Sequence, residues 1–92
     1  MTWEIRIHPK AIKELGDIDK RNRYRIKEKM SELSNSFGKK DLGLDIKPVA
    51  GAKRGVKLYR LRVGDYRVIF EVTKNVLWIA RISHRSEVYK GL

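Results

Sequence analysis

The chain has 92 residues, a length that accommodates one domain and no second hydrophobic core. It carries 22 Lys and Arg against 11 Asp and Glu, and this net charge of +11 must lie on the surface and attract polyanions, because unpaired charges are rarely buried. The absence of cysteine and the presence of only two histidines exclude disulfides, a thiolate zinc site, a cysteine nucleophile and a histidine-built metal site. With no apolar signal sequence and no membrane-length apolar run, we expect a soluble, cytoplasmic protein.

The N-terminal segment predicts a strand followed by a short helix. Trp3, Ile5 and Ile7 alternate with polar residues, which is the two-residue period of a half-buried strand. Pro9 suits the first turn of a helix, where its missing N–H is not needed. We expect a break over residues 16–19, with the aspartate at its end capping the next helix.

The second helix has the clearest periodicity in the chain. Apolar residues recur at i, i+4, i+7 and i+11, at Ile26, Met30, Leu33 and Phe37. The positions between them form an outward face that is almost entirely positive. Its basic residues are Arg21, Arg23, Arg25, Lys27 and Lys29.

The C-terminal half predicts an antiparallel meander. After a loop that includes a short strand near Leu44–Val49, strand patterns cover Val56–Val63, Tyr66–Val72 and Val76–Ile82, with Gly64 and Asp65 suited to a tight two-residue hairpin. The order indicates one α+β domain over residues 1–92. It consists of an N-terminal strand, a two-helix hairpin and a three-strand antiparallel meander, with the helices packed on one face of a small sheet.

Strand parity predicts which side chains the helices leave uncovered. In the last strand, Val76, Trp78, Ala80 and Ile82 are expected to face the helices, and the core is expected to include Trp3, Tyr24 and Trp78. The opposite sheet face collects Arg60, Arg62, Arg67 and Arg81. Four arginines on an open face repel one another, which favours binding of an anionic ligand.

The sequences LYRLRVGDYRVIFEV and VLWIARISHRSEVYKGL, preceded by a strand and two helices, resemble the RelE/ParE toxin superfamily. Its members share an arginine-bearing hairpin and a closing His-Arg-x-Glu-Val-Tyr, and the resemblance covers nearly the whole chain. RelE-like members are ribosome-dependent, metal-free endoribonucleases that cut mRNA in the ribosomal A site. A ribose 2′-OH attacks the adjacent phosphate, leaving 2′,3′-cyclic phosphate and 5′-OH ends. The resemblance therefore implies an enzyme without a metal or other cofactor.

The resemblance also implies residue roles. Arg67 matches the arginine that stabilises the transition state, and Arg60 and Arg62 match positions that orient the phosphates. Because a guanidinium does not deprotonate, proton transfer is left to His84 or Tyr89. For binding of mRNA and of ribosomal RNA we expect the basic helix residues above together with Arg81 and Arg85.

Two other functions stay open: a ParE-like poison of DNA gyrase, and a non-catalytic basic module that binds RNA or the ribosome. A membrane-surface role is disfavoured because the core needs the aliphatic face of the basic helix. The resemblance further implies a co-expressed acidic antitoxin, largely disordered alone, which would neutralise the arginine face.

Overall fold

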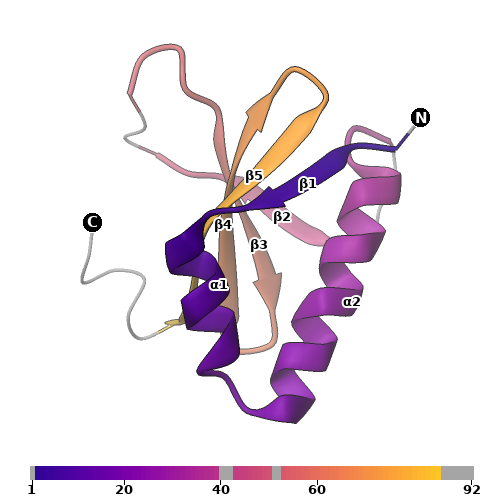
Figure 1. The fold of residues 1–92 in the computed structure, drawn as a ribbon. Helices are drawn as coiled ribbons and strands as arrows, with labels where there is room; N and C mark the ends of the chain where they lie inside the picture. The colour runs from indigo at the N-terminus through magenta and orange to yellow at the C-terminus, as the bar shows by residue number, and fades with distance from the viewer. Residues whose placement is uncertain (1, 40–42, 51–52, 86–92) are drawn as a thin grey trace.

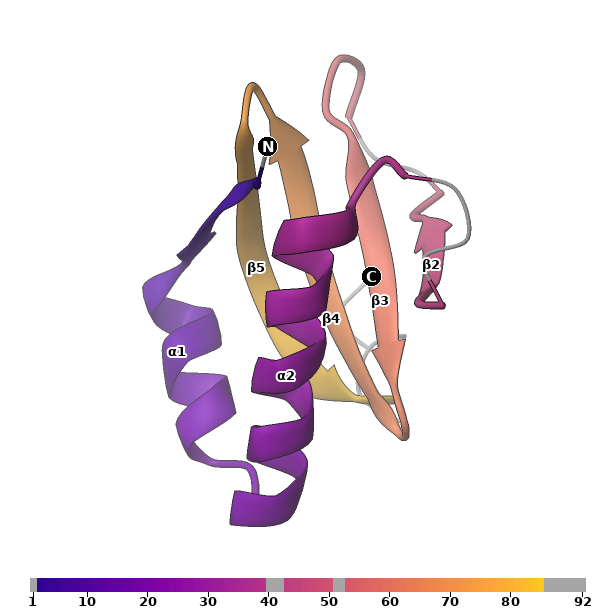
Figure 2. The ribbon, with the colours of Figure 1, turned by 90° about the vertical axis from the view of Figure 1, so that its right-hand side faces the viewer.

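The computed structural model describes residues 2–39, 43–50 and 53–85. Its elements are β1 (Glu4–Ile7), α1 (Pro9–Gly16), α2 (Lys20–Ser36), β2 (Asp45–Pro48), β3 (Leu58–Val63), β4 (Tyr66–Thr73) and β5 (Val76–His84). The sheet has the order β1-β5-β4-β3-β2, with β1 parallel to β5 and the other neighbours antiparallel (Figure 1). Both helices lie on the same side of this sheet (Figure 2). The predicted α+β class, the helix hairpin and the meander are confirmed.

The predicted start of each helix is also confirmed. Pro9 is the first residue of α1. Asp19 caps α2, since its carboxylate accepts hydrogen bonds from the Asn22 side chain at 2.8 Å and the Asn22 backbone N–H at 3.2 Å. These hydrogen bonds keep the pKa of Asp19 below its ordinary value, so the cap is charged at neutral pH. None of the described helices is long and apolar enough to cross a membrane.

The core lies between the helices and the sheet face that they cover. Its fully buried members include Ile26 and Leu33 of α2 and Leu61, Val68 and Phe70 of the sheet. At one end an aromatic cluster closes it. The ring of Phe37 makes edge-to-face contacts with Trp3 at 5.4 Å and with Tyr59 and Phe70 at 5.6 Å between centroids. The core position expected for Trp3 is therefore confirmed.

A β-bulge in β5 reverses part of the predicted parity. Ile69 pairs with Arg81 while the next residue, Phe70, pairs with Ile79, so Ala80 is inserted without a partner. Before the bulge the buried residue is therefore Ile79, and Trp78 lies on the uncovered face, where the guanidinium carbon of Arg6 is 5.4 Å from its ring centroid. The core assignment of Trp78 was wrong, because one extra residue exchanges the two faces of a strand.

The outer edge of β5 has two different partners. β1 pairs only with its first half, from Val76 to Ile79. Beyond that point a carboxylate of α1 takes over, since Glu14 Oε1 accepts the Ile82 N–H at 2.9 Å. Its second oxygen lies 3.4 Å from the Arg81 guanidinium. A side chain thus accepts the hydrogen bond of the Ile82 backbone N–H, at a point on the edge of β5 where no strand pairs with it.

Candidate functional site

The sheet face opposite the helices carries its arginines in two rows across the strands; Arg62 is exposed there, whereas Arg67 is buried. Arg62 of β3 lies directly opposite Arg67 of β4, and Arg60 lies opposite Ile69, which in turn pairs with Arg81. Because directly paired residues project from the same face of a sheet, the side chains of these arginines leave the backbone on one face, as strand parity predicted. Like charges in opposed positions destabilise a sheet, which makes this face suited to a polyanion.

The turn between β3 and β4 gathers three guanidinium groups around Gly64. The Gly64 carbonyl accepts from Arg62 Nε at 3.3 Å and from Arg67 Nη1 at 3.4 Å, and the same Nη1 donates to the Tyr66 carbonyl at 3.2 Å. From the helix side, both terminal nitrogens of Arg25 lie 3.5 Å from the point that a Cβ on Gly64 would occupy. Gly64 has a φ of +60°, a conformation that favours glycine. The turn therefore joins the cationic face of α2 to the open sheet face.

The two arginines of the chain near the end of β5 differ in surroundings. Arg81 starts on the open face, but its guanidinium pairs with Glu14 beyond the strand edge. Arg85 is exposed, and its backbone N–H donates to the Asp65 carbonyl at 2.6 Å, which holds it beside the β3–β4 turn. Of these two residues, Arg85 therefore has its backbone beside the turn whose Gly64 carbonyl accepts hydrogen bonds from Arg62 and Arg67.

His84 belongs to the other face of the sheet. It pairs with Tyr66, next to the buried pair of Val68 and Ile82, and its ring lies edge-to-face on the Tyr66 ring at 5.5 Å. Both rings line a hollow of about 320 Å³ whose further lining includes Glu14, Asp17 and Asp19. The structure thus brings Arg60, Arg62 and Arg67 together and separates His84 from them by the sheet. Tyr89 lies outside the described residues.

The basic residues predicted on α2 fall into two groups. Arg21, Arg25 and Lys27 are exposed. The other two have protein partners: the guanidinium of Arg23 donates to the Ile18 carbonyl at 3.1 and 3.3 Å, and Lys29 pairs with Glu32 at 3.1 Å. Arg23 therefore also fixes the link between the two helices.

Comparison with known proteins identifies the family. The model of the family described as ParE toxin of type II toxin–antitoxin system, parDE, matches residues 5–89. The chain belongs to the RelE/ParE toxin family.

The toxin is 37% identical to toxin RelE3 of Methanocaldococcus jannaschii over 78 residues, which are 85% of each chain. It is similar to the toxin in the RelB–RelE antitoxin–toxin complex from Methanococcus jannaschii, with a TM-score of 0.75, 32% identity and coverage of 94% of this chain and 96% of that one. For the archaeal RelE–RelB complex from Pyrococcus horikoshii the TM-score is 0.76 and the identity 29%, over 96% and 100% of the two chains.

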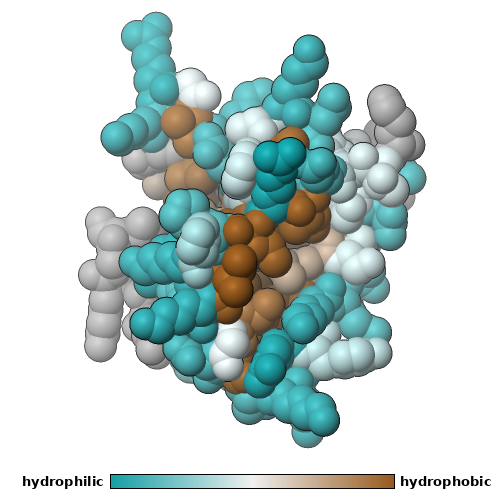
Figure 3. All heavy atoms as spheres, viewed as in Figure 1, coloured by the Kyte–Doolittle hydropathy of each residue, from teal (hydrophilic) through white to brown (hydrophobic). Residues whose placement is uncertain are grey.

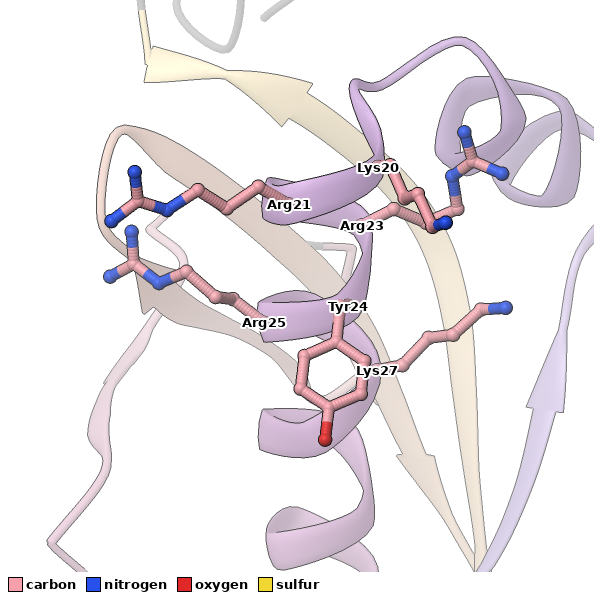
Figure 4. A pocket seen from close by; sticks show the side chains of 6 residues that line it. All are labelled: Lys20, Arg21, Arg23, Tyr24, Arg25 and Lys27. Carbon is pink, nitrogen blue, oxygen red and sulfur yellow. The ribbon is translucent and has the colours of Figure 1, made fainter.

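Sequence reasoning missed Tyr24, which was assigned to the core and is 63% exposed. Its position gave a signal: Tyr24 stands two residues before Ile26 and therefore off the apolar stripe of the helix. The phenol hydrogen-bonds to the Glu28 carboxylate, which raises the pKa of Tyr24 above its ordinary value. The toxin thus presents a neutral aromatic ring among the cations of α2 (Figure 4).

Proposed function

We propose that this toxin is a ribosome-dependent endoribonuclease that cleaves mRNA without a metal ion. The 2′-oxygen of a ribose forms a bond to the adjacent phosphorus while the bond from phosphorus to the 5′-oxygen breaks. The 2′-OH proton passes to a base and the leaving 5′-oxygen receives a proton, so the products are a 2′,3′-cyclic phosphate and a 5′-OH. The observation that supports this most strongly is the opposed pair of Arg62 and Arg67 on the open face beside Gly64.

The surroundings of Arg67 suit stabilisation of a transition state. Its side chain is largely buried, and one of its terminal nitrogens donates to the carbonyls of Gly64 and Tyr66. A guanidinium held in this way needs little reorganisation when negative charge grows on the phosphate oxygens. Arg62, directly opposite and exposed, is proposed to orient the phosphate, with Arg60 two residues earlier on the same face.

Proton transfer is proposed for His84 or Tyr89. Because His84 starts on the other face of the sheet from the arginines, its role requires that the RNA reach it around the strand ends, and the variants below test this. We expect His84→Ala and Tyr89→Phe each to slow mRNA cleavage by about 10²-fold or more, the usual scale for an acid or base, with little change in ribosome binding. The measurement is single-turnover cleavage on programmed ribosomes. His8→Ala is the matched control, because His8 is exposed and makes no side-chain capping bond at the start of α1. Unchanged rates in both site variants would remove these residues from the mechanism.

A protein antitoxin is part of the proposed function. The similar solved structures named above are RelB–RelE and RelE–RelB complexes, so we propose an equivalent partner for this toxin. Seen from the side of the helices, apolar side chains form a band between α1 and α2 with charged residues around it (Figure 3). On α1, Ile12 is 56% exposed. These features suit an amphipathic acidic segment that becomes helical on the toxin.

The alternative is a ParE-like poison of DNA gyrase, which is kept because the matching family is described as a ParE toxin. The discriminating experiment adds the toxin to a cell-free translation reaction, maps mRNA ends by primer extension and runs a gyrase cleavage assay in parallel. New mRNA ends that require ribosomes support the endoribonuclease. Intact mRNA with trapped gyrase–DNA complexes supports the gyrase poison. Ribosome binding with neither product supports a non-catalytic module.

A further inference from the structure

Tyr24 lies in the most strongly cationic surface of α2. With five basic residues it lines a hollow of about 780 Å³ on the N-terminal half of the helix (Figure 4). The basic residues are Lys20, Arg21, Arg23, Arg25 and Lys27. In Figure 4, Arg21 and Arg25 extend to one side of the helix and Lys27 to the other, with the Tyr24 ring between them. An exposed aromatic ring is thus flanked by flexible cations.

This arrangement of charge does not serve the stability of the helix. Arg21 and Arg25, like Arg23 and Lys27, are like-charged pairs at i,i+4, which destabilise a helix. Cations are also unfavourable at a helix N-terminus, and the first turn of α2 contains no acidic residue. Within the described part of the chain, no acidic side chain forms a salt bridge with any residue lining this hollow. Apart from Arg23, whose guanidinium donates to the Ile18 carbonyl, these cations are therefore available to an anionic ligand.

The aromatic ring narrows the class of ligand. An acidic peptide would need the cations alone, whereas a nucleotide combines phosphates with a flat base that stacks on an aromatic face. The surface is also continuous with the proposed cleavage site, since Arg25 reaches Gly64, whose carbonyl binds Arg62 and Arg67 from the sheet side. One polyanion can thus follow the cations from the open sheet face around the turn to α2.

We propose that Tyr24 and the cations around it form a second RNA subsite, which binds an unpaired nucleotide of single-stranded RNA. The base stacks on the Tyr24 ring, and Lys20, Arg21 and Lys27 contact the flanking phosphates. Arg25 connects this subsite with the open sheet face. The inference concerns binding and does not depend on whether the open face cleaves RNA.

The test measures binding of the full-length toxin to a fluorescent single-stranded RNA of about 12 nucleotides, a length within the usual site sizes for single strands. The RNA is 2′-O-methylated throughout, so that cleavage cannot affect the result. Tyr24→Ala is expected to weaken binding by about 5- to 100-fold, the usual loss for one stacked base, whereas Tyr24→Phe keeps the ring and stays within about two-fold. Because Tyr24 is exposed, both variants should fold, which circular dichroism verifies.

The cations are tested separately through salt dependence. The double variant Lys20→Ala with Lys27→Ala should lower the slope of log Kd against log salt by about 1 to 1.5, whereas Tyr24→Ala should leave it unchanged. Equal RNA affinity of the wild type and Tyr24→Ala would overturn the proposal. The proposal would also be overturned if Tyr24→Ala weakened binding to a poly-glutamate peptide or to duplex RNA as much as it weakens binding to single-stranded RNA. The first result would indicate an acidic protein segment as the ligand, and the second would indicate that the surface contacts only the phosphate backbone.

Discussion

Arg67→Ala is expected to slow ribosome-dependent mRNA cleavage by about 10²- to 10³-fold and to abolish toxicity on expression. A single well-placed donor to a developing anion contributes roughly 3–4 kcal/mol to the transition state. The carbonyls of Gly64 and Tyr66 hold this largely buried guanidinium in place, opposite Arg62. Arg67→Lys should rescue the rate only in part, because an ammonium lacks the planar fork that binds two phosphate oxygens.

The control for Arg67 must separate catalysis from folding, since the same side chain also binds the β3–β4 turn. Measuring thermal unfolding and ribosome binding of each variant shows whether a slower cleavage rate comes from lost catalysis or from lost folding or binding. Arg54→Ala is the matched charge control, because Arg54 is exposed and precedes β3, at the other end of the strand from Gly64. Wild-type cleavage by a folded Arg67→Ala variant would contradict the proposed role.

The antitoxin is expected to associate with the toxin at a rate that falls by about 10- to 10³-fold as salt rises from about 50 to 500 mM, while dissociation changes much less. The reason is the net charge of +11 together with the open face that carries Arg60, Arg62 and Arg67. At the higher salt the Debye length shrinks to a few ångströms, so long-range steering is lost. Stopped-flow mixing of the separated toxin and antitoxin measures both rates.

The partner itself gives a second check on this electrostatic account. A pull-down of the native complex should recover an acidic protein that is disordered alone. A basic or neutral partner, or an association rate indifferent to salt, would show that charge does not drive the encounter. In that case the antitoxin would depend on the apolar surface between the helices rather than on the arginine face.

Local periodicity was sufficient to predict most elements of the fold. The apolar stripe of Ile26, Met30 and Leu33, the Asp19 cap and the hairpin at Gly64 all depend on residues close in the sequence. The parallel pairing of β1 with β5 and the bulge at Ala80 depend instead on contacts between distant segments. No local pattern distinguishes a bulged strand from a regular one.

In the candidate site, too, some features could be predicted from local sequence and others depend on contacts between distant segments. Parity alone placed Arg60, Arg62 and Arg67 on one face, because each belongs to a strand segment without a bulge. Sequence spacing does not determine how long side chains pack in the folded protein. It therefore could not predict that Arg25 reaches Gly64 or that Arg81 pairs with Glu14. The separation of His84 from the arginines follows from parity within β5, but its contact with Tyr66 needed the register of β4 and β5.

The most direct test of the central claim replaces one atom of the substrate. Once primer extension has located a cleavage site, an mRNA is made with a 2′-deoxynucleotide on the 5′ side of the phosphate that is cut. If the 2′-oxygen is the nucleophile, cleavage at that phosphate disappears, neighbouring sites persist, and the unmodified mRNA yields 2′,3′-cyclic phosphate and 5′-OH ends. Undiminished cleavage beside the 2′-deoxynucleotide would contradict the proposed reaction.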